Sequence, residues 1–138
     1  MKTLAKTFVI STALLPLWAA AQINVENARI VATQQANEPS AIYMKLHNSS
    51  NETVNLAMVQ SAQQPEATFH LHGTQNGKMI MVEGIEVPAQ GSVELKRGGL
   101  HIMVFDVNKP LSKGDSLPVT LFFDNGEKIE QQVEVVTP

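Results

Sequence analysis

Short apolar segments separated by turn-forming residues run along most of this chain, and this pattern constrains its fold more than any other feature. From residue 22 onward, no long segment repeats its apolar residues with the helical period of about 3.6. Glycine, asparagine, proline and serine interrupt the chain at short intervals instead. Many short strands at such spacing are typical of a β-sandwich or barrel. The sequence therefore predicts an all-β fold, an antiparallel β-sandwich.

Nine segments are predicted to be strands. They cover residues 28–32, 41–47, 54–61, 68–72, 78–82, 93–96, 101–107, 117–123 and 129–136. The last two form the clearest hairpin, because apolar residues alternate on both sides of the turn at 124–126. No internal repeat, linker or low-complexity tract divides the chain. We therefore expect a single domain over residues 22–138.

Residues 1–21 have the composition of a secretory signal peptide. Lys2 and Lys6 precede an apolar stretch over 7–18, and Ala19-Ala20-Ala21 supplies the small residues of a cleavage site. The stretch is shorter than the roughly 20 residues that span a bilayer, which disfavours the alternative of an uncleaved anchor. We therefore expect an exported, soluble protein.

Charge and cysteine content exclude several classes of function. The chain carries 10 Lys and Arg against 13 Asp and Glu, and losing Lys2 and Lys6 with a signal peptide would change its net charge from −3 to −5. This balance argues against nucleic acid or an anionic membrane as partner. The chain has no cysteine, which excludes thiolate nucleophiles, tetrathiolate zinc sites and blue-copper sites. Burial alone must hold the fold, since there are no disulfides.

Histidine and methionine cluster in three short segments: His70-Leu71-His72, Met79-Ile80-Met81 and His101-Ile102-Met103. Residues i and i+2 of a strand share a face, so each segment presents two donors together. Imidazole and thioether are ligands that favour Cu(I). A strand methionine usually packs in the core, as we expect for Met44 and Met58. The three segments together, in a chain without cysteine, nevertheless favour a metal site.

The first two segments would face each other in a hairpin. If the hairpin around residues 75–77 closes so that the numbers of opposed residues sum to 151, His72 lies opposite Met79 and His70 lies opposite Met81, with all four side chains on one face. Directly opposed Cβ atoms lie about 4.5–5.5 Å apart, which suits two donors holding one ion. We assume this register, and a slip of one residue would break the pairing of the donors. Two donors from the hairpin and two from the third segment would make a four-coordinate N2S2 site.

The third segment also carries a family resemblance. Gly98-Gly99-Leu100-His101-Ile102-Met103 resembles the Gly-Gly-Leu-His-x-Met signature of the periplasmic copper chaperones of the PCu(A)C family. Residues 41–44, 48, 79–89, 93–96, 109–111 and 114–115 match the family's flanking segments, so the resemblance extends from about residue 41 to 136. It implies a cupredoxin-like β-sandwich that binds Cu(I) through two histidines and two methionines. It also implies delivery to a recipient such as the copper centre of a cytochrome c oxidase subunit.

The family spacing fits this chain only if the hairpin is shortened. The family's 21 residues between its first Met and its second His lead from His101 back to Met79, but only six residues, not ten, separate Met79 from His72. His70 and Met81 have ten residues between them, which leaves only 19 from Met81 to His101. A shorter loop tip resolves the mismatch at little cost. The implied ligands are His72, Met79, His101 and Met103, with His70 and Met81 in reserve.

Three functional hypotheses remain open at this point. The first is a periplasmic Cu(I) chaperone that has no catalytic residue and is not an enzyme. The second is a β-sandwich adhesion or assembly module whose histidines and methionines are incidental. The third is a zinc-dependent hydrolase that holds zinc through His70, His72 and His101. Neither Glu83 nor Asp106 is convincingly placed as its general base.

Overall fold

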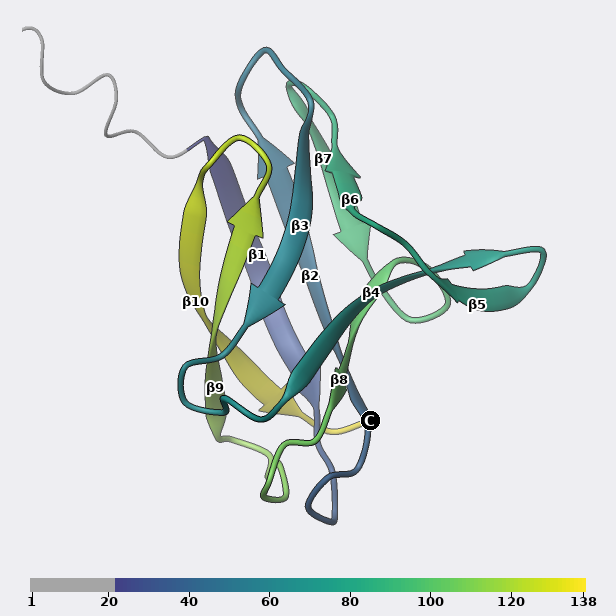
Figure 1. Cartoon of the computed structure of the whole chain (residues 1–138), viewed down its shortest axis with the longest axis vertical. Coiled ribbons are helices and arrows are strands. Elements are labelled where there is room, and N and C mark those ends of the chain that lie inside the picture. The colour runs from purple at the N-terminus through teal and green to yellow at the C-terminus, as the bar shows by residue number, and fades with distance from the viewer. Residues whose placement is uncertain (1–21) are drawn as a thin grey trace, which may run out of the picture.

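The computed structural model describes residues 22–138, so the signal peptide expected over residues 1–21 lies outside the described residues. The described chain forms ten strands (Figure 1). They are β1 Ile23–Val31, β2 Ser40–Asn48, β3 Val54–Gln60, β4 Thr68–Gln75, β5 Lys78–Met81, β6 Ile85–Val87, β7 Gly91–Leu95, β8 His101–Phe105, β9 Ser116–Phe123 and β10 Lys128–Val136. Among these residues there is no helix with the length and apolarity that crossing a membrane requires.

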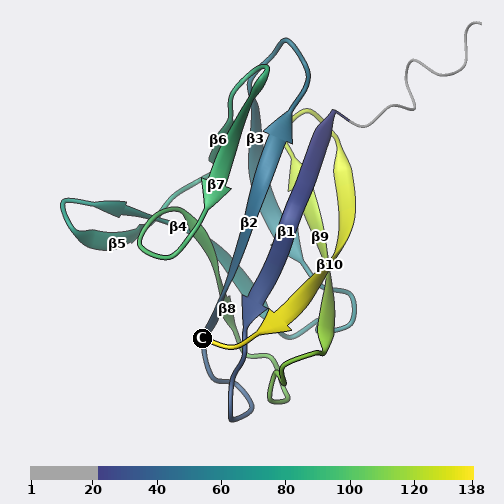
Figure 2. The same ribbon diagram turned by 180° about the vertical axis from the view of Figure 1, so that it is seen from behind.

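The strands form two layers of one curled sheet. Its hydrogen-bonded order is β5-β4-β8-β2-β1-β10-β9-β3-β6, and β7 also pairs with β2. β1 and β2 lie in one layer and β3 and β9 in the other, as the two opposite views show (Figures 1 and 2). Alternate side chains from both layers meet in a buried apolar core, which includes Ile30, Ile42, Leu71, Ile102, Leu56, Leu121 and Val133. The predicted all-β sandwich is therefore confirmed.

One strand pair departs from the predicted antiparallel arrangement. β1 and β10 run parallel, with Arg29 paired to Glu134 and Val31 to Val136. The other pairs described by the structure are antiparallel. Because nearly the whole domain connects these two strands, no hairpin turn forces them into opposite directions. This pair joins the two layers.

Two strands share one edge of β2. Residues 40–42 of β2 pair with β8, whereas residues 44–48 pair with β7. The intervening residues 96–100 leave that edge as a tight loop, in which the Lys96 N–H donates to the Leu100 carbonyl at 2.8 Å and the Gly99 N–H to the Lys96 carbonyl at 3.0 Å. Gly98 adopts a left-handed φ of 83°, which glycine tolerates without strain. β8 therefore begins at His101, directly after this loop.

The β4–β5 hairpin projects from the body of the sandwich (Figures 1 and 2). Gln75 pairs with Lys78, so the turn contains only Asn76 and Gly77. Both residues have positive φ, 53° and 78°, as a two-residue type I′ turn requires. The register assumed from the sequence is therefore wrong: His72 lies opposite Met81 rather than Met79, a shift of two residues.

Of the two methionines expected in the core, one is buried and the other is exposed. Met44 is fully buried, as predicted, but Met58 is 44% exposed. The pairing of β3 with β9 shifts between Leu56 and Met58, so two successive residues, Ala57 and Met58, point outward. The core prediction for Met58 is therefore wrong, because a bulge interrupts the alternation of the strand.

Candidate metal centre

The candidate ligands lie on the outer face of β4, β8 and β5. Leu71 of β4 pairs with Ile102 of β8, and both are buried in the core. Since successive side chains of a strand point to opposite faces, the histidines and methionine that flank these two residues point away from the core. The sequence prediction that each His and Met pair shares a face is confirmed.

The pairing arranges these donors in rows across the strands. In the central row, His72 of β4 pairs with Met81 of β5 on one side and with His101 of β8 on the other. In the next row toward the start of β4, His70 pairs with Met103. Neighbouring strands lie about 4.8 Å apart, so the donors of one row are close enough to converge.

The expected opposition of His72 to Met79 and of His70 to Met81 is corrected by this register. Met79 lies opposite Thr74 instead, one row nearer the tip of the hairpin. Because the shift is an even number of residues, every donor stays on the predicted face and only its row changes. The structure therefore brings His72, Met81 and His101 together, with Met103 diagonal to His72, and leaves Met79 farther out.

His101 is buried and its ring is held in place. Its side chain is 4% exposed, and its Nδ1 lies 2.8 Å from the Gly99 carbonyl oxygen. A carbonyl can only accept, so Nδ1 carries the hydrogen, and a neutral ring then keeps its free lone pair on Nε2. This is the arrangement by which ligating histidines fix their tautomer and orientation. The Tyr43 ring lies 6.4 Å away, centroid to centroid, on the β2 side.

His72 lacks the partners that a buried imidazole normally has. Its Nδ1 and Nε2 are both buried, and neither makes a hydrogen bond. Its ring centroid lies 5.5 Å from that of His101 and 6.0 Å from that of His70. Burial lowers the pKa of His72 below its ordinary value, and the charges of His101 and His70 lower it further. The ring is therefore held neutral, the form that binds a metal, with lone-pair capacity unused.

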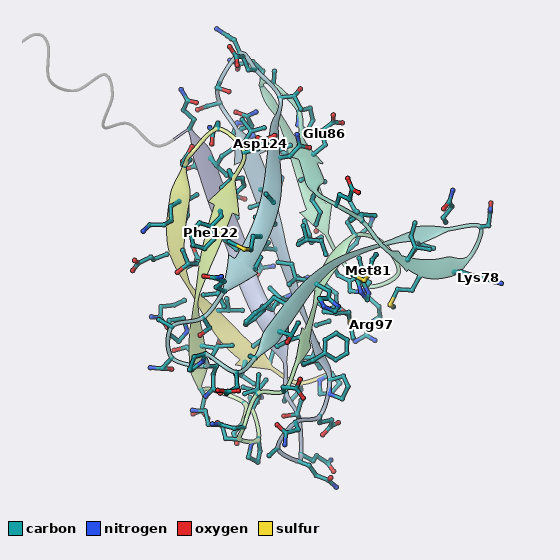
Figure 3. The ribbon with its side chains drawn as sticks, in the orientation of Figure 1. Lys78, Met81, Glu86, Arg97, Phe122 and Asp124 are labelled. Carbon is teal, nitrogen blue, oxygen red and sulfur yellow. The ribbon has the colours of Figure 1, made fainter. Side chains whose placement is uncertain are left out.

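The methionines of the cluster differ in exposure. Met79 and Met81 on β5 are 57% and 63% exposed, whereas Met103 on β8 is half-buried. Met81 lies where β5 leaves the body of the sandwich, and Lys78 marks the tip of the projecting hairpin (Figure 3). Two exposed thioethers beside a polar cluster are unusual for packing residues, which are normally buried.

The three histidines alone do not form a metal site in the described part of the chain. No group of three or more His, Asp or Glu side chains there is arranged to hold an ion. The zinc site of His70, His72 and His101 considered from the sequence therefore finds no support in the arrangement.

Two contacts between the hairpin and the loop before β8 were not predicted from the sequence. Thr74 donates from its Oγ1 to the Gly98 carbonyl at 3.2 Å and so links the hairpin to the loop before β8. Gly73 lies close to that loop as well, since a Cβ there would meet Leu100 at 3.3 Å. The family-like segment 41–44 already contained Tyr43, but nothing in the sequence placed its ring beside His101.

Comparison with known proteins identifies the family. Residues 23–135 match the family model described as LpqE-like, a lipoprotein family by its description. This chain belongs to the LpqE-like family. An uncharacterized protein of Rickettsia prowazekii is 31% identical over 116 residues, which cover 81% of this chain and 60% of the relative. A protein of Leifsonia xyli subsp. xyli, named as a lipoprotein, is 30% identical over 90 residues, 63% of this chain and 54% of the relative. The chain thus spans roughly half to three fifths of these relatives.

Solved structures share the fold. The copper-bound PCuAC domain from PmoF2 superposes with a TM-score of 0.74 at 22% identity, covering 86% of this chain and 95% of that domain. The CuI-DR1885 structure from Deinococcus radiodurans gives a TM-score of 0.62 at 23% identity, covering 85% and 81%. The PCu(A)C-like, cupredoxin-like sandwich predicted from the sequence is therefore confirmed as the fold.

Proposed function

We propose that this LpqE-like protein is an exported Cu(I)-binding chaperone that hands its ion to a copper-receiving protein. The observation that carries the proposal is the environment of the His72 ring. Its two ring nitrogens are buried without a hydrogen-bond partner, in a row between Met81 and His101. A buried polar side chain left unpaired costs stability, so such an orphan calls for an explanation. A bound soft cation provides one.

The proposed ligands are two imidazoles and two thioethers. His72 and His101 supply nitrogen from adjacent strands, and Met103 supplies sulfur from β8. For the second sulfur we favour Met81 over Met79, because Met81 pairs directly with His72. The two methionines lie two positions apart, about 6.5–7 Å along the strand, so one ion cannot bind both without distortion of the strand. The family spacing favours Met79, so variants must decide between them.

This donor set suits Cu(I) and suits its transfer. Imidazole and thioether are soft or borderline ligands, and none of the four carries a negative charge. Thioethers need no deprotonation, and the lowered pKa of His72 keeps its ring available. An ion held by neutral ligands is released more easily than one held by thiolates. Stepwise replacement of these ligands by those of a partner is therefore feasible.

The comparisons support the proposal in two ways. The structural neighbours with this fold include a copper-bound domain and a protein solved with CuI. A relative named as a lipoprotein, and the family's own description, support export. The signature at 98–103 resembles that of periplasmic chaperones, from which we propose the periplasm as location. The recipient, on the same resemblance, is a protein such as the copper-bearing subunit of cytochrome c oxidase.

X-ray absorption of the protein loaded with one equivalent of Cu(I) tests the proposal. We expect two sulfur and two nitrogen scatterers per copper. Met103→Leu should remove one sulfur and weaken binding, while stability changes by less than about 1.5 kcal/mol because the volume is conserved. Met58→Leu is the control, since it makes the same change at a methionine of β3, a strand that carries none of the proposed ligands.

A thermal melt separates this function from the assembly-module hypothesis. A ligand that binds only the folded state raises the melting temperature. We expect Cu(I) under reducing conditions to raise that of the wild type and to raise it less in Met103→Leu. An unchanged melting temperature in the wild type would reject the copper proposal and favour a module whose histidines and methionines are incidental.

A further inference from the structure

The four-donor site leaves one imidazole of the cluster without a role. His70 lies on the same face of β4 as His72, two residues earlier, and their ring centroids are 6.0 Å apart. Its direct partner across the strands is Met103 of β8. Opposed Cβ atoms in such a pair lie about 4.5–5.5 Å apart, so the two donors can reach a common ion. His70 and Met103 therefore form a second nitrogen–sulfur pair, and Met103 belongs to both rows.

A shallow surface cavity adjoins this second pair. Its volume is about 270 Å³, and Thr68, His70, Phe105 and Asp106 line it. The Phe105 ring lies 5.4 Å from that of His70, centroid to centroid. Asp106, which also lines the cavity, is exposed. His70 thus borders the cavity and is partly exposed, whereas both nitrogens of His72 are buried.

Two larger cavities in the described chain lack soft donors. One cavity, of about 460 Å³, is lined mainly by polar residues, including Ser50, Glu52 and Asp124. A second, about 340 Å³, lies around Gln60, Gln64 and Pro65. Neither contains a histidine or a methionine. Of these three cavities, the one beside His70 has the chemistry that suits a soft cation.

We infer that His70 is a transfer ligand, and that Cu(I) enters and leaves the four-donor site through a station formed by His70 and Met103 beside this cavity. The inference rests on the proposed function. On release, the bonds from copper to His72, His101 and the β5 methionine break, the bond to Met103 persists, and a bond to a His70 nitrogen forms. Copper remains Cu(I) throughout, so no electron is exchanged. A donor of the recipient then approaches through the cavity and displaces both ligands.

A transfer ligand changes rates without changing the equilibrium. His70→Ala should therefore leave the Cu(I) affinity within about threefold of wild type, while loading and release both slow by about tenfold or more. Release is measured by stopped flow, as transfer to the Cu(I) chelator bathocuproine disulfonate. Affinity is measured by equilibrium competition with the same chelator. His70→Met keeps a soft donor at the position and should restore most of the rate.

His47→Ala is the control, because His47 is a half-buried histidine of β2 that lies outside the cluster. Its Nδ1 is hydrogen-bonded to Ser92 Oγ at 2.8 Å. It should match wild type in both measurements. An unchanged release rate in His70→Ala would overturn the inference. A loss of affinity through faster release would also overturn it, because His70 would then be a ligand of the resting site. Failure of the wild type to bind Cu(I) would instead reject the proposed function, so the two failures are distinguishable.

Discussion

The two sides of the candidate metal centre are built differently. On the β8 side, the strand lies between β4 and β2, and His101 is 4% exposed with its ring fixed by the Gly99 carbonyl. On the β5 side, the strand ends the sheet, and its methionines are more than half exposed. The first side is organised before an ion binds, and the second must still lose side-chain freedom to close on it. A site with one fixed and one adjustable side can bind an ion and still release it.

Removing a fixed ligand should have the largest effect. His101→Ala deletes a buried ring that is already oriented for binding, so we expect the Cu(I) affinity to fall by more than the roughly 10–100-fold typical of changes beyond the ligands themselves. Chelator competition measures the affinity, and His47→Ala serves as the control. A loss of less than tenfold would mean that the β8 side does not anchor the ion.

The exposed side should show a smaller and uneven effect. Met81→Leu removes the sulfur opposite His72, and we expect an affinity loss of about tenfold, or roughly 1.4 kcal/mol. Met79→Leu, one row away, should lose less than about threefold. Both changes conserve volume, so each is the other's control. A larger loss from Met79→Leu would show that the family spacing, rather than the strand pairing, identifies the ligand.

The stability of the copper-free protein should depend on pH through His72. Its folded pKa is lowered, so the unfolded chain binds the proton more readily. The contribution of neutral His72 to the free energy of unfolding is therefore fully present above the unfolded-state pKa of about 6.5. It is lost as the pH falls from there toward the lowered pKa of the folded state. Urea unfolding at about pH 7.5 and about pH 5, on either side of the unfolded-state pKa of about 6.5, measures this loss. His72→Phe should flatten the dependence, and an equally steep fall in that variant would assign it to other groups.

The link between the hairpin and the loop before β8 should contribute least. Thr74→Val removes the hydroxyl that donates to the Gly98 carbonyl while keeping the branched shape. Because the bond is exposed to water, we expect a stability loss near or below the roughly 0.5–1.5 kcal/mol of a typical hydrogen bond. Urea unfolding measures it. A drop in copper affinity larger than that of Met81→Leu would show that the link, rather than the ligands, sets the geometry of the exposed side.

The sequence predicted the layers and the ligand face better than it predicted the pairing. Alternation identified most strands, but β6 has only three residues between Gly84 and Pro88, too few to show a period. β1 begins five residues before the predicted strand. A bulge at Asn27, with φ of 54°, interrupts the alternation of apolar residues, so the sequence pattern did not reveal the first part of the strand. The parallel pairing of β1 with β10 depends on contacts across the whole chain, which no local pattern reports.

The hairpin register, by contrast, could have been predicted. Asn76-Gly77 is the preferred sequence of a two-residue turn with positive φ at both positions. A turn of these two residues alone pairs Gln75 with Lys78, and therefore His72 with Met81. The orphaned nitrogens of His72 could not have been anticipated, since burial of a side chain on the outer face depends on how the hairpin and the neighbouring loop pack around it.

The parallel pair also has a consequence for how the molecule is made. The hydrogen-bonded path from one layer to the other passes through β1 and β10, the first and last strands of the described chain. A ribosome makes β1 before β10, so a nascent chain leaves one edge of β1 unpaired until β10 has been made. Such long-range closure is slow and leaves an unpaired edge exposed to aggregation. Deleting residues 128–136 should therefore yield an insoluble chain, although every candidate copper ligand would still be present.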